Sequence, residues 1–194
     1  MTNRGLFNWC VLIALLTGLY TLVYFLIPPL ANAGVVYATF IALPIFFISG
    51  AGPKDLPNFI VSNITGVVWG LMYVFLDYFM GVNLGLSAAL GAQGGTIVLA
   101  FVCFIVTLVC CAFHMICTSK TLFNKLPAMF AGIAGVFSIW GSFYTDAGAL
   151  TVPFDRVIPL ALTLAFGSTL AMTMGQGVKL LNDEGKWKFL SGKK

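Results

Sequence analysis

Lys54–Tyr73 reads "KDLPNFIVSNITGVVWGLMY", and the same pattern returns at Asn124–Tyr144 as "NKLPAMFAGIAGVFSIWGSFY". Each stretch places Leu-Pro before an apolar run, followed by Trp-Gly and then a tyrosine. Proline in the first turn of a helix lacks only an N–H that would have had no partner there. Each Leu-Pro therefore predicts a helix start, and the two helices are expected to begin at the same side of a membrane and run in parallel.

The composition predicts an all-α, polytopic membrane protein. Of 194 residues, 60% are hydrophobic and 8% are charged, whereas about 25% are charged in a typical soluble domain. A membrane-spanning helix needs roughly 20 mostly apolar residues. Six segments fit a helical span, at approximately 6–28, 34–52, 57–77, 94–117, 126–144 and 156–178. These segments are continuously apolar, which excludes the alternation of apolar and polar residues in a β-barrel strand.

The repeated pattern predicts an internal organisation of three helical hairpins. "TGLYTLVY" in the first segment offers a weaker third copy, in which Tyr20 and Tyr24 stand for the Trp and the Tyr. We expect six transmembrane helices as three tandem parallel-repeat hairpins, at about 6–52, 57–117 and 126–178. Such repeats favour a pseudo-symmetric bundle around an axis normal to the membrane. The domain would span 1–178, with a basic cytoplasmic tail at 179–194.

Charge predicts the orientation of the chain. Lys and Arg near the ends of spans resist translocation across the membrane. The predicted topology puts nine of the ten basic residues on one side, and Arg156 on the other. Both termini are therefore predicted to be cytoplasmic, in the cell inner (plasma) membrane. This topology explains the net charge of +4, so the expected partner is the lipid bilayer and no nucleic acid. The nine are Arg4, Lys54, Lys120, Lys125, Lys179, Lys186, Lys188, Lys193 and Lys194.

A polar stripe on the third segment is the candidate lining of a pathway. At helical spacing these side chains share one face: Asn58, Ser62, Thr65, Trp69 and Tyr73. Polar side chains in lipid are costly and turn inward, to a path for small solutes or to a neighbouring helix. The aromatic counterparts are Trp140, Tyr144, Tyr20 and Tyr24, for which a membrane-interface belt is the alternative. Asn63 and Thr65 form a glycosylation sequon, which was discounted because it lies within a span.

Two further sets of residues have candidate roles at the ends of the spans. Asp77 and Asp146 each follow a repeat tyrosine and could ring an outer vestibule, or be ordinary solvated carboxylates. Cys110, His114 and Cys117 share one helical face and could bind a soft metal such as Cu(I) or Zn(II). The alternative is that the cysteines are small hydrophobes. No cofactor is expected.

The function predicted from these features is passive transport. No ionisable side chain lies at the expected mid-membrane depth, where coupled transporters usually keep one. We expect a channel or facilitator for a small polar or uncharged solute of unknown identity. The alternatives are a soft-metal or ion-coupled transporter and a non-transport scaffold or regulator. No nucleotide loop, catalytic triad or paired-carboxylate motif is present in the sequence, so no enzyme is expected. Faces of small residues make a homo-oligomer plausible.

Three segments resemble a known family. "GVVWGLMY", "LPAMFAGIAGVFSI" and "VIPLALTLAFGSTLAM" are similar to the corresponding parts of small bacterial inner-membrane proteins called domain of unknown function 1097. The resemblance runs from about Leu15 to Gly177, and the connection before the fourth segment is longer than in the family. It implies a six-helix inner-membrane protein and no particular substrate or catalytic residue.

Overall fold

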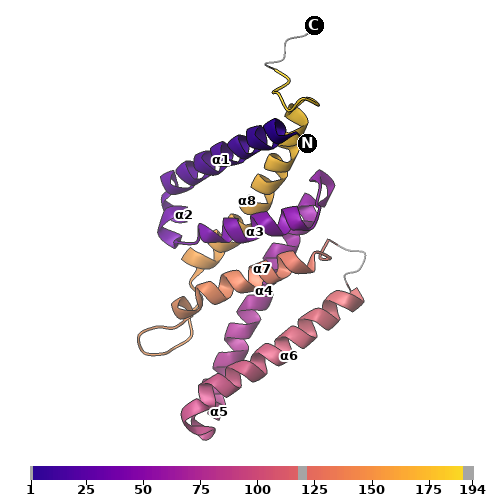
Figure 1. The fold of residues 1–194 in the computed structure, drawn as a ribbon. Coiled ribbons are helices and arrows are strands. Elements are labelled where there is room, and N and C mark those ends of the chain that lie inside the picture. Colours follow the sequence, from indigo (N-terminus) through magenta and orange to yellow (C-terminus); the bar gives the residue numbers. More distant parts are fainter. Residues whose placement is uncertain (1, 118–121, 190–194) are drawn as a thin grey trace.

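The computed structural model describes residues 2–117 and 122–189, with the backbone alone at 116 and 117 (Figure 1). Over these residues the fold is all-α and contains eight helices. Their bounds are α1 Asn3–Leu26, α2 Pro28–Ala33, α3 Tyr37–Ile48, α4 Leu56–Tyr78, α5 Leu86–Ala89, α6 Gly94–Cys117, α7 Leu126–Ser138 and α8 Phe154–Gly177.

Four of these elements are long and apolar enough to cross a membrane. With their adjoining turns they cover Asn3–Leu26, Pro53–Asn83, Gly91–Met115 and Phe154–Leu180. An α-helix rises about 1.5 Å per residue, and the hydrocarbon layer is about 30 Å thick. The prediction of an all-helical, multi-pass membrane protein is confirmed in this form.

The second predicted segment, 34–52, is broken into shorter pieces. Pro28 and Pro29 end α1 and begin the short helix α2. Gly34 then adopts a left-handed conformation, with φ of 68°, which glycine reaches without strain. α3 consequently has only 12 residues.

The fifth predicted segment, 126–144, is also shorter as a regular helix. α7 has 13 residues and is followed by a 3-10 helix at Trp140–Phe143. Its start at Leu126, and that of α4 at Leu56, confirm the helix starts predicted from Leu-Pro.

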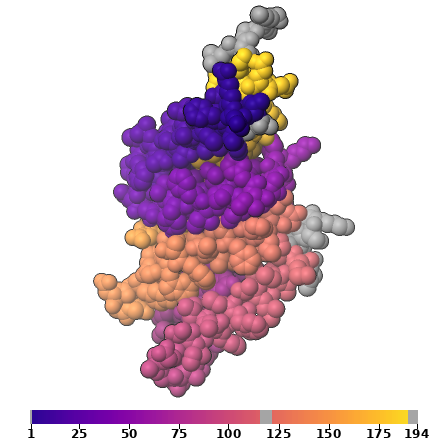
Figure 2. All heavy atoms as spheres, in the orientation of Figure 1, coloured from indigo at the N-terminus to yellow at the C-terminus, as the bar shows by residue number. Residues whose placement is uncertain are grey.

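The helices form two crossing sets. Figure 2 shows α1, α3, α7 and α6 as successive bands on one face, and α8 and α4 cross behind them in Figure 1. α4 packs closely along α7, α3 packs along α8, and α4 meets α8 near the centre. A buried apolar cluster holds these central helices together and includes Val35, Val67, Val136, Leu160 and Leu164.

Contacts between helices fix their relative directions. Tyr20 and Trp9 of α1 meet Thr39 and Phe47 of α3, so these two helices are antiparallel. Further pairs of contacts make α4 antiparallel to α6, α4 parallel to α7, α3 parallel to α8, and α3 antiparallel to α7. The six main helices therefore alternate in direction along the chain.

The three predicted hairpins do not occupy equivalent positions in this packing. α4 and α7, which carry the two clear copies of the sequence pattern, lie side by side and parallel. α1 lies at the edge and packs mainly against α8 and α2. Only 6% of its most apolar stretch is buried inside the protein. The expected threefold arrangement is therefore not reproduced.

The described part of the tail, residues 179–189, packs against the start of α1. Asn8 donates a hydrogen bond from Nδ2 to the Gly185 carbonyl oxygen, at 2.8 Å. Thr2 donates from Oγ1 to the Glu184 carbonyl oxygen, at 3.3 Å. The two ends of the described chain thus lie together.

Candidate functional site

Polar side chains are buried where the central helices meet. Five polar residues have no exposed surface, and they come from α3, α4 and α8. A buried hydroxyl or amide in an apolar helix needs a hydrogen-bond partner, so their bonding identifies the polar centre of the protein. They are Thr39, Ser62, Asn63, Thr163 and Ser168.

Asn63 lies at the contact between α4 and α8. Its Nδ2 donates to Ser168 Oγ at 3.0 Å and to the Leu164 carbonyl oxygen at 3.4 Å. Its Oδ1 has no hydrogen-bond partner, and it is the one buried side-chain polar atom of the described residues in that condition. Burying an unpartnered acceptor costs about 1–3 kcal/mol. The structure therefore keeps an open acceptor at its centre at a cost in stability.

The tyrosines of α1 contact the buried threonines. Tyr20 OH lies 2.5 Å from Thr39 Oγ1, and Tyr24 OH lies 3.2 Å from Thr163 Oγ1. Thr163 itself donates to the Pro159 carbonyl oxygen one turn earlier, at 2.6 Å. Tyr20 and Tyr24 therefore belong to a hydroxyl cluster among α1, α3 and α8.

The first residues of the predicted polar stripe on α4 form hydrogen bonds with the segment that precedes α7. Asn58 Nδ2 donates to Asn124 Oδ1 at 2.5 Å, and Asn58 Oδ1 accepts from the Asn124 N–H at 3.2 Å. Ser62 Oγ accepts from the Lys125 N–H at 3.3 Å. Thr65 donates to the Val61 carbonyl oxygen within its own helix. These polar groups are thus occupied by bonds to the segment before α7 and, for Thr65, by a bond within α4.

The aromatic positions of α4 and the α7 region form a second group. Tyr73 OH lies 2.6 Å from Thr107 Oγ1 of α6, and the Tyr73 ring meets Phe137 edge-on at 5.1 Å. Trp140 packs against Phe137 at 5.3 Å, and Trp69 packs against Phe113 at 6.2 Å. Next to this group an apolar hollow of about 240 Å³ is lined by Leu99, Cys103, Phe137 and Trp140.

The predicted candidates therefore divide into two clusters. Tyr20 and Tyr24 lie with α3 and α8, while Trp69, Tyr73 and Trp140 lie with α6 and α7. Tyr144 contacts Tyr78 at 6.3 Å near the end of α4. Asp77 is half-buried in the last turn of α4, and Asp146 is exposed in the following loop of the third hairpin.

On the cysteine face of α6, Cys110 packs against α7. Cys110 is fully buried, with its Sγ 3.6 Å from Met129 Sδ. Among the side chains that the structure describes, no group of three His, Cys, Asp or Glu residues could hold a metal ion. The side chain of Cys117 lies outside the described residues, and His114 lies in the last turns of α6.

Asn63 and its surroundings are a site that the sequence patterns did not predict. The predicted stripe passed through Ser62, whereas the residue of α4 that bonds to α8 is Asn63, one position further along the helix. An amide within an apolar span is costly, and this alone could have singled out Asn63. Ser168 and Thr163 gave no comparable signal, because hydroxyls readily bond to their own helix.

The long apolar helices and the buried polar centre define a multi-pass membrane protein. The chain belongs to the family described as "Protein of unknown function (DUF1097)", whose model matches residues 10–179. No curated protein and no solved structure matches the chain.

Proposed function

We propose that the protein is a facilitator, with six membrane crossings, for a small polar or uncharged solute in the cell inner membrane. The observation that carries the proposal is the unpartnered Oδ1 of Asn63, buried at the contact of two long apolar helices. A polar group kept at a cost inside apolar surroundings is a functional-site hypothesis by default. The site offers one open hydrogen-bond acceptor, Asn63 Oδ1, beside the hydroxyl of Ser168. Such groups can bind a small solute but do not form a catalytic set, which favours passive transport over catalysis.

Six crossings are supported by the alternating directions of the main helices. α3 and α7 are short, so α2 and the 3-10 helix after α7 would complete their crossings. Irregular backbone at membrane depth is tolerated where protein covers it. Val35, in the break between α2 and α3, has no exposed surface.

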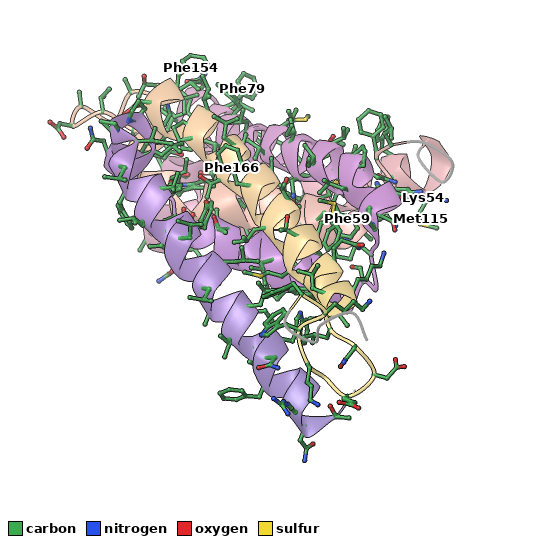
Figure 3. All side chains as sticks on the ribbon, turned by 90° about the horizontal axis from the view of Figure 1, so that it is seen from above. Lys54, Phe59, Phe79, Met115, Phe154 and Phe166 are labelled. Atoms are coloured by element: carbon green, nitrogen blue, oxygen red, sulfur yellow. The ribbon has the colours of Figure 1, made fainter. Side chains whose placement is uncertain are left out.

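Cytoplasmic termini are supported by the distribution of charge. Arg4, Lys54 and Lys125 lie at the end of the bundle that also holds the tail, whereas Arg156 begins α8 at the other end. Figure 3 shows this separation, with Lys54 and Met115 at one end and Phe79 and Phe154 at the other. The positive-inside rule assigns the first end to the cytoplasm.

Passive rather than ion-coupled transport is supported by the place of the charges within the helices. Arg4, Asp77, Asp155 and Arg156 lie in the first or last turn of their helices. α3 and α7 contain no Asp, Glu, Lys or Arg. Proton- and ion-coupled transporters usually keep such a group within the membrane.

The test is solute flux into proteoliposomes, followed by stopped-flow light scattering with water, urea, glycerol, ammonia and short-chain acids. Selective flux above protein-free vesicles supports a facilitator. Tyr73→Phe and Trp140→Phe would be compared with Thr173→Ala, an exposed hydroxyl that bonds within α8. A change of flux in the first two alone would make the aromatic cluster part of the pathway. Absence of flux for every solute, with correctly inserted protein, would overturn the proposal.

A second candidate is a non-transport membrane scaffold. Close backbone contact between α4 and α7, at Gly66 and Gly132, favours it, because such packing suits a closed bundle. A scaffold would give no flux and would leave the aromatic residues with packing roles.

A further inference from the structure

Two halves of the chain contain helices of matching length in the same order. The first half, Asn3–Tyr78, has main helices of 24, 12 and 23 residues. The second half, Gly94–Gly177, has main helices of 24, 13 and 24 residues. The order pairs α1 with α6, α3 with α7, and α4 with α8.

Each helix runs opposite to its counterpart. Tyr37 of α3 contacts Ser138 at the end of α7, and Phe46 lies with Ala128 at its start, so α3 and α7 are antiparallel. α3 is parallel to α8, and α7 is parallel to α4, which makes α4 and α8 antiparallel as well. α1 is antiparallel to α3, and α6 is antiparallel to α4. Because α3 and α4 themselves run in opposite directions, α1 and α6 do so as well. This is the arrangement of two inverted repeats.

The packing partners also correspond. α3 packs along α8, the third helix of the other half, and α7 packs along α4 in the same way. α1 packs against α8 as α6 packs against α4. Exchange of the two halves therefore leaves these four helix contacts unchanged, although the contact between α7 and α8 has no counterpart of similar extent between α3 and α4. The band order α1, α3, α7, α6 in Figure 2 is also the same after this exchange when it is followed from the other end.

Close glycine contacts repeat at residue level. A Cβ on Gly167 of α8 would meet the Thr39 carbonyl oxygen of α3, and a Cβ on Gly66 of α4 would meet the Met129 carbonyl oxygen of α7. The contacted segments read "ATFIA" at 38–42 and "AMFAG" at 128–132. In both, the first, second and fifth residues are buried. The central phenylalanines, Phe40 and Phe130, are 46% and 39% exposed.

We infer that the protein consists of two inverted three-helix halves, and that Asn63, where their third helices meet, binds a small uncharged solute that donates a hydrogen bond. In proteins built from inverted repeats, the substrate site lies at the repeat interface near the membrane midplane. Asn63 bonds to Leu164 and Ser168, so it lies at this interface. This inference rests on the proposed function and names its site and its class of solute.

The chemistry of Asn63 selects the class of solute. Its amide donor is already bonded to Ser168, and its oxygen is the open group. A bound solute must therefore supply an N–H or O–H donor. The charged side chains of the described helices lie in terminal turns, so nothing at this depth would balance a charge on the solute.

The inverted halves also give the site access from two sides. Asn63 is fully buried in this state, so a solute reaches it when α4 and α8 separate. Because the halves have equivalent contacts, a movement that opens the site toward one side has a counterpart that opens it toward the other. Such a cycle carries solute down its gradient without a coupled ion.

The experiment measures urea flux and solute-dependent melting for the wild type and Asn63→Leu, with Asn83→Leu as the matched control. Asn83 is exposed in the turn after α4. Urea donates hydrogen bonds and tetramethylurea has no N–H. We expect urea, and not tetramethylurea, to raise the melting temperature of the wild type and the control. Asn63→Leu should show no such shift, and its urea flux should be about tenfold lower than that of the wild type. A factor of this size corresponds to the loss of one buried hydrogen bond.

The outcomes separate the inference from the proposed function. If the wild type shows flux and Asn63→Leu has the same flux, the proposed site at Asn63 is overturned while the facilitator function is still supported. A urea shift that Asn63→Leu abolishes, without flux in any sample, supports the site and overturns transport. Absence of both flux and shift in the wild type overturns both. If Asn63→Leu does not insert, Asn63→Ala removes the same oxygen without added bulk and is judged by the same results.

Discussion

Gly66 of α4 lies directly against the backbone carbonyl of Met129 in α7, so that a single methyl group on Gly66 would meet that oxygen. The contacting atom belongs to the backbone and cannot turn away as a side chain would. Gly132 makes the reciprocal approach, since a Cβ there would meet the Asn63 carbonyl oxygen. The close contact between α4 and α7 therefore depends on two glycines, one on each helix.

Gly66→Ala is expected to lower the free energy of unfolding by about 3 kcal/mol, the upper part of the range for overpacking a core. Gly167→Ala should have a similar effect, because its Cβ would meet the Thr39 carbonyl oxygen. Gly18→Ala is the control, since a Cβ there has nothing within 4 Å. Thermal unfolding in detergent measures all three, and equal stability of the three variants would contradict the close contacts.

Tyr73→Phe is expected to lower stability by about 0.6 kcal/mol, the average for hydrogen bonds between membrane helices, and by no more than about 1.7 kcal/mol. The variant removes the hydroxyl that lies 2.6 Å from Thr107 Oγ1 and keeps the ring contact with Phe137. Thr107→Val should cost a similar amount, and the double variant should cost less than the sum. Tyr78→Phe, at the half-buried end of α4, provides the comparison. Additive losses would show that the two hydroxyls are not coupled.

The ion pair between Lys125 and Asp55 is expected to contribute less than 1 kcal/mol, roughly the limit for exposed pairs. Nζ lies 2.8 Å from Asp55 Oδ1, and the two side chains are 27% and 38% exposed. Lys125→Met should cost more than Asp55→Asn, because Nζ also lies 5.4 Å from the centre of the Phe59 ring. A double-mutant cycle at low and high salt measures the coupling, which should fall as salt rises. A salt-independent coupling would contradict this account.

Cysteine labelling is expected to place the two ends of the bundle on opposite sides of the membrane. In a Cys10→Ser background, Asp146→Cys should react with an impermeant maleimide in intact cells, and Lys54→Cys only after permeabilisation. Both positions are exposed, and Lys54 follows the end of α3, where Phe47 contacts Trp9 near the start of α1. Labelling of both before permeabilisation, or the reverse pattern, would contradict cytoplasmic termini.

Helix boundaries were predictable where local chemistry sets them. The starts of α4 and α7 follow from Leu-Pro, and the predicted segment 94–117 coincides with α6. The segments 34–52 and 126–144 were predicted too long, because hydrophobic length does not distinguish a regular helix from a broken one. Gly34 ends α2 through its left-handed conformation, and α7 gives way to a 3-10 helix after Ser138.

Candidate residues were less predictable than helices. A helical wheel placed Ser62 and Tyr73 on one stripe, and both are buried. The wheel did not say which neighbour each would meet, and Ser62 bonds to the segment before α7 while Tyr73 bonds to α6. In the sequence, Asn63 stands out only as part of a glycosylation sequon within a span, whereas the packing of α4 against α8 makes it the central polar residue of the fold.

The sequence by itself determined that this is a membrane protein of apolar helices with basic residues gathered at one end. Those properties depend on composition and on local patterns, such as proline in a first turn. Only the tertiary structure decided that α4 lies along α7, that α3 lies along α8, and that Asn63 faces Ser168. Lipid tails are as apolar as the helix surfaces, so the hydrophobic effect does not determine which helices pack together. Close backbone approach at glycines and hydrogen bonds between buried polar groups determine it instead.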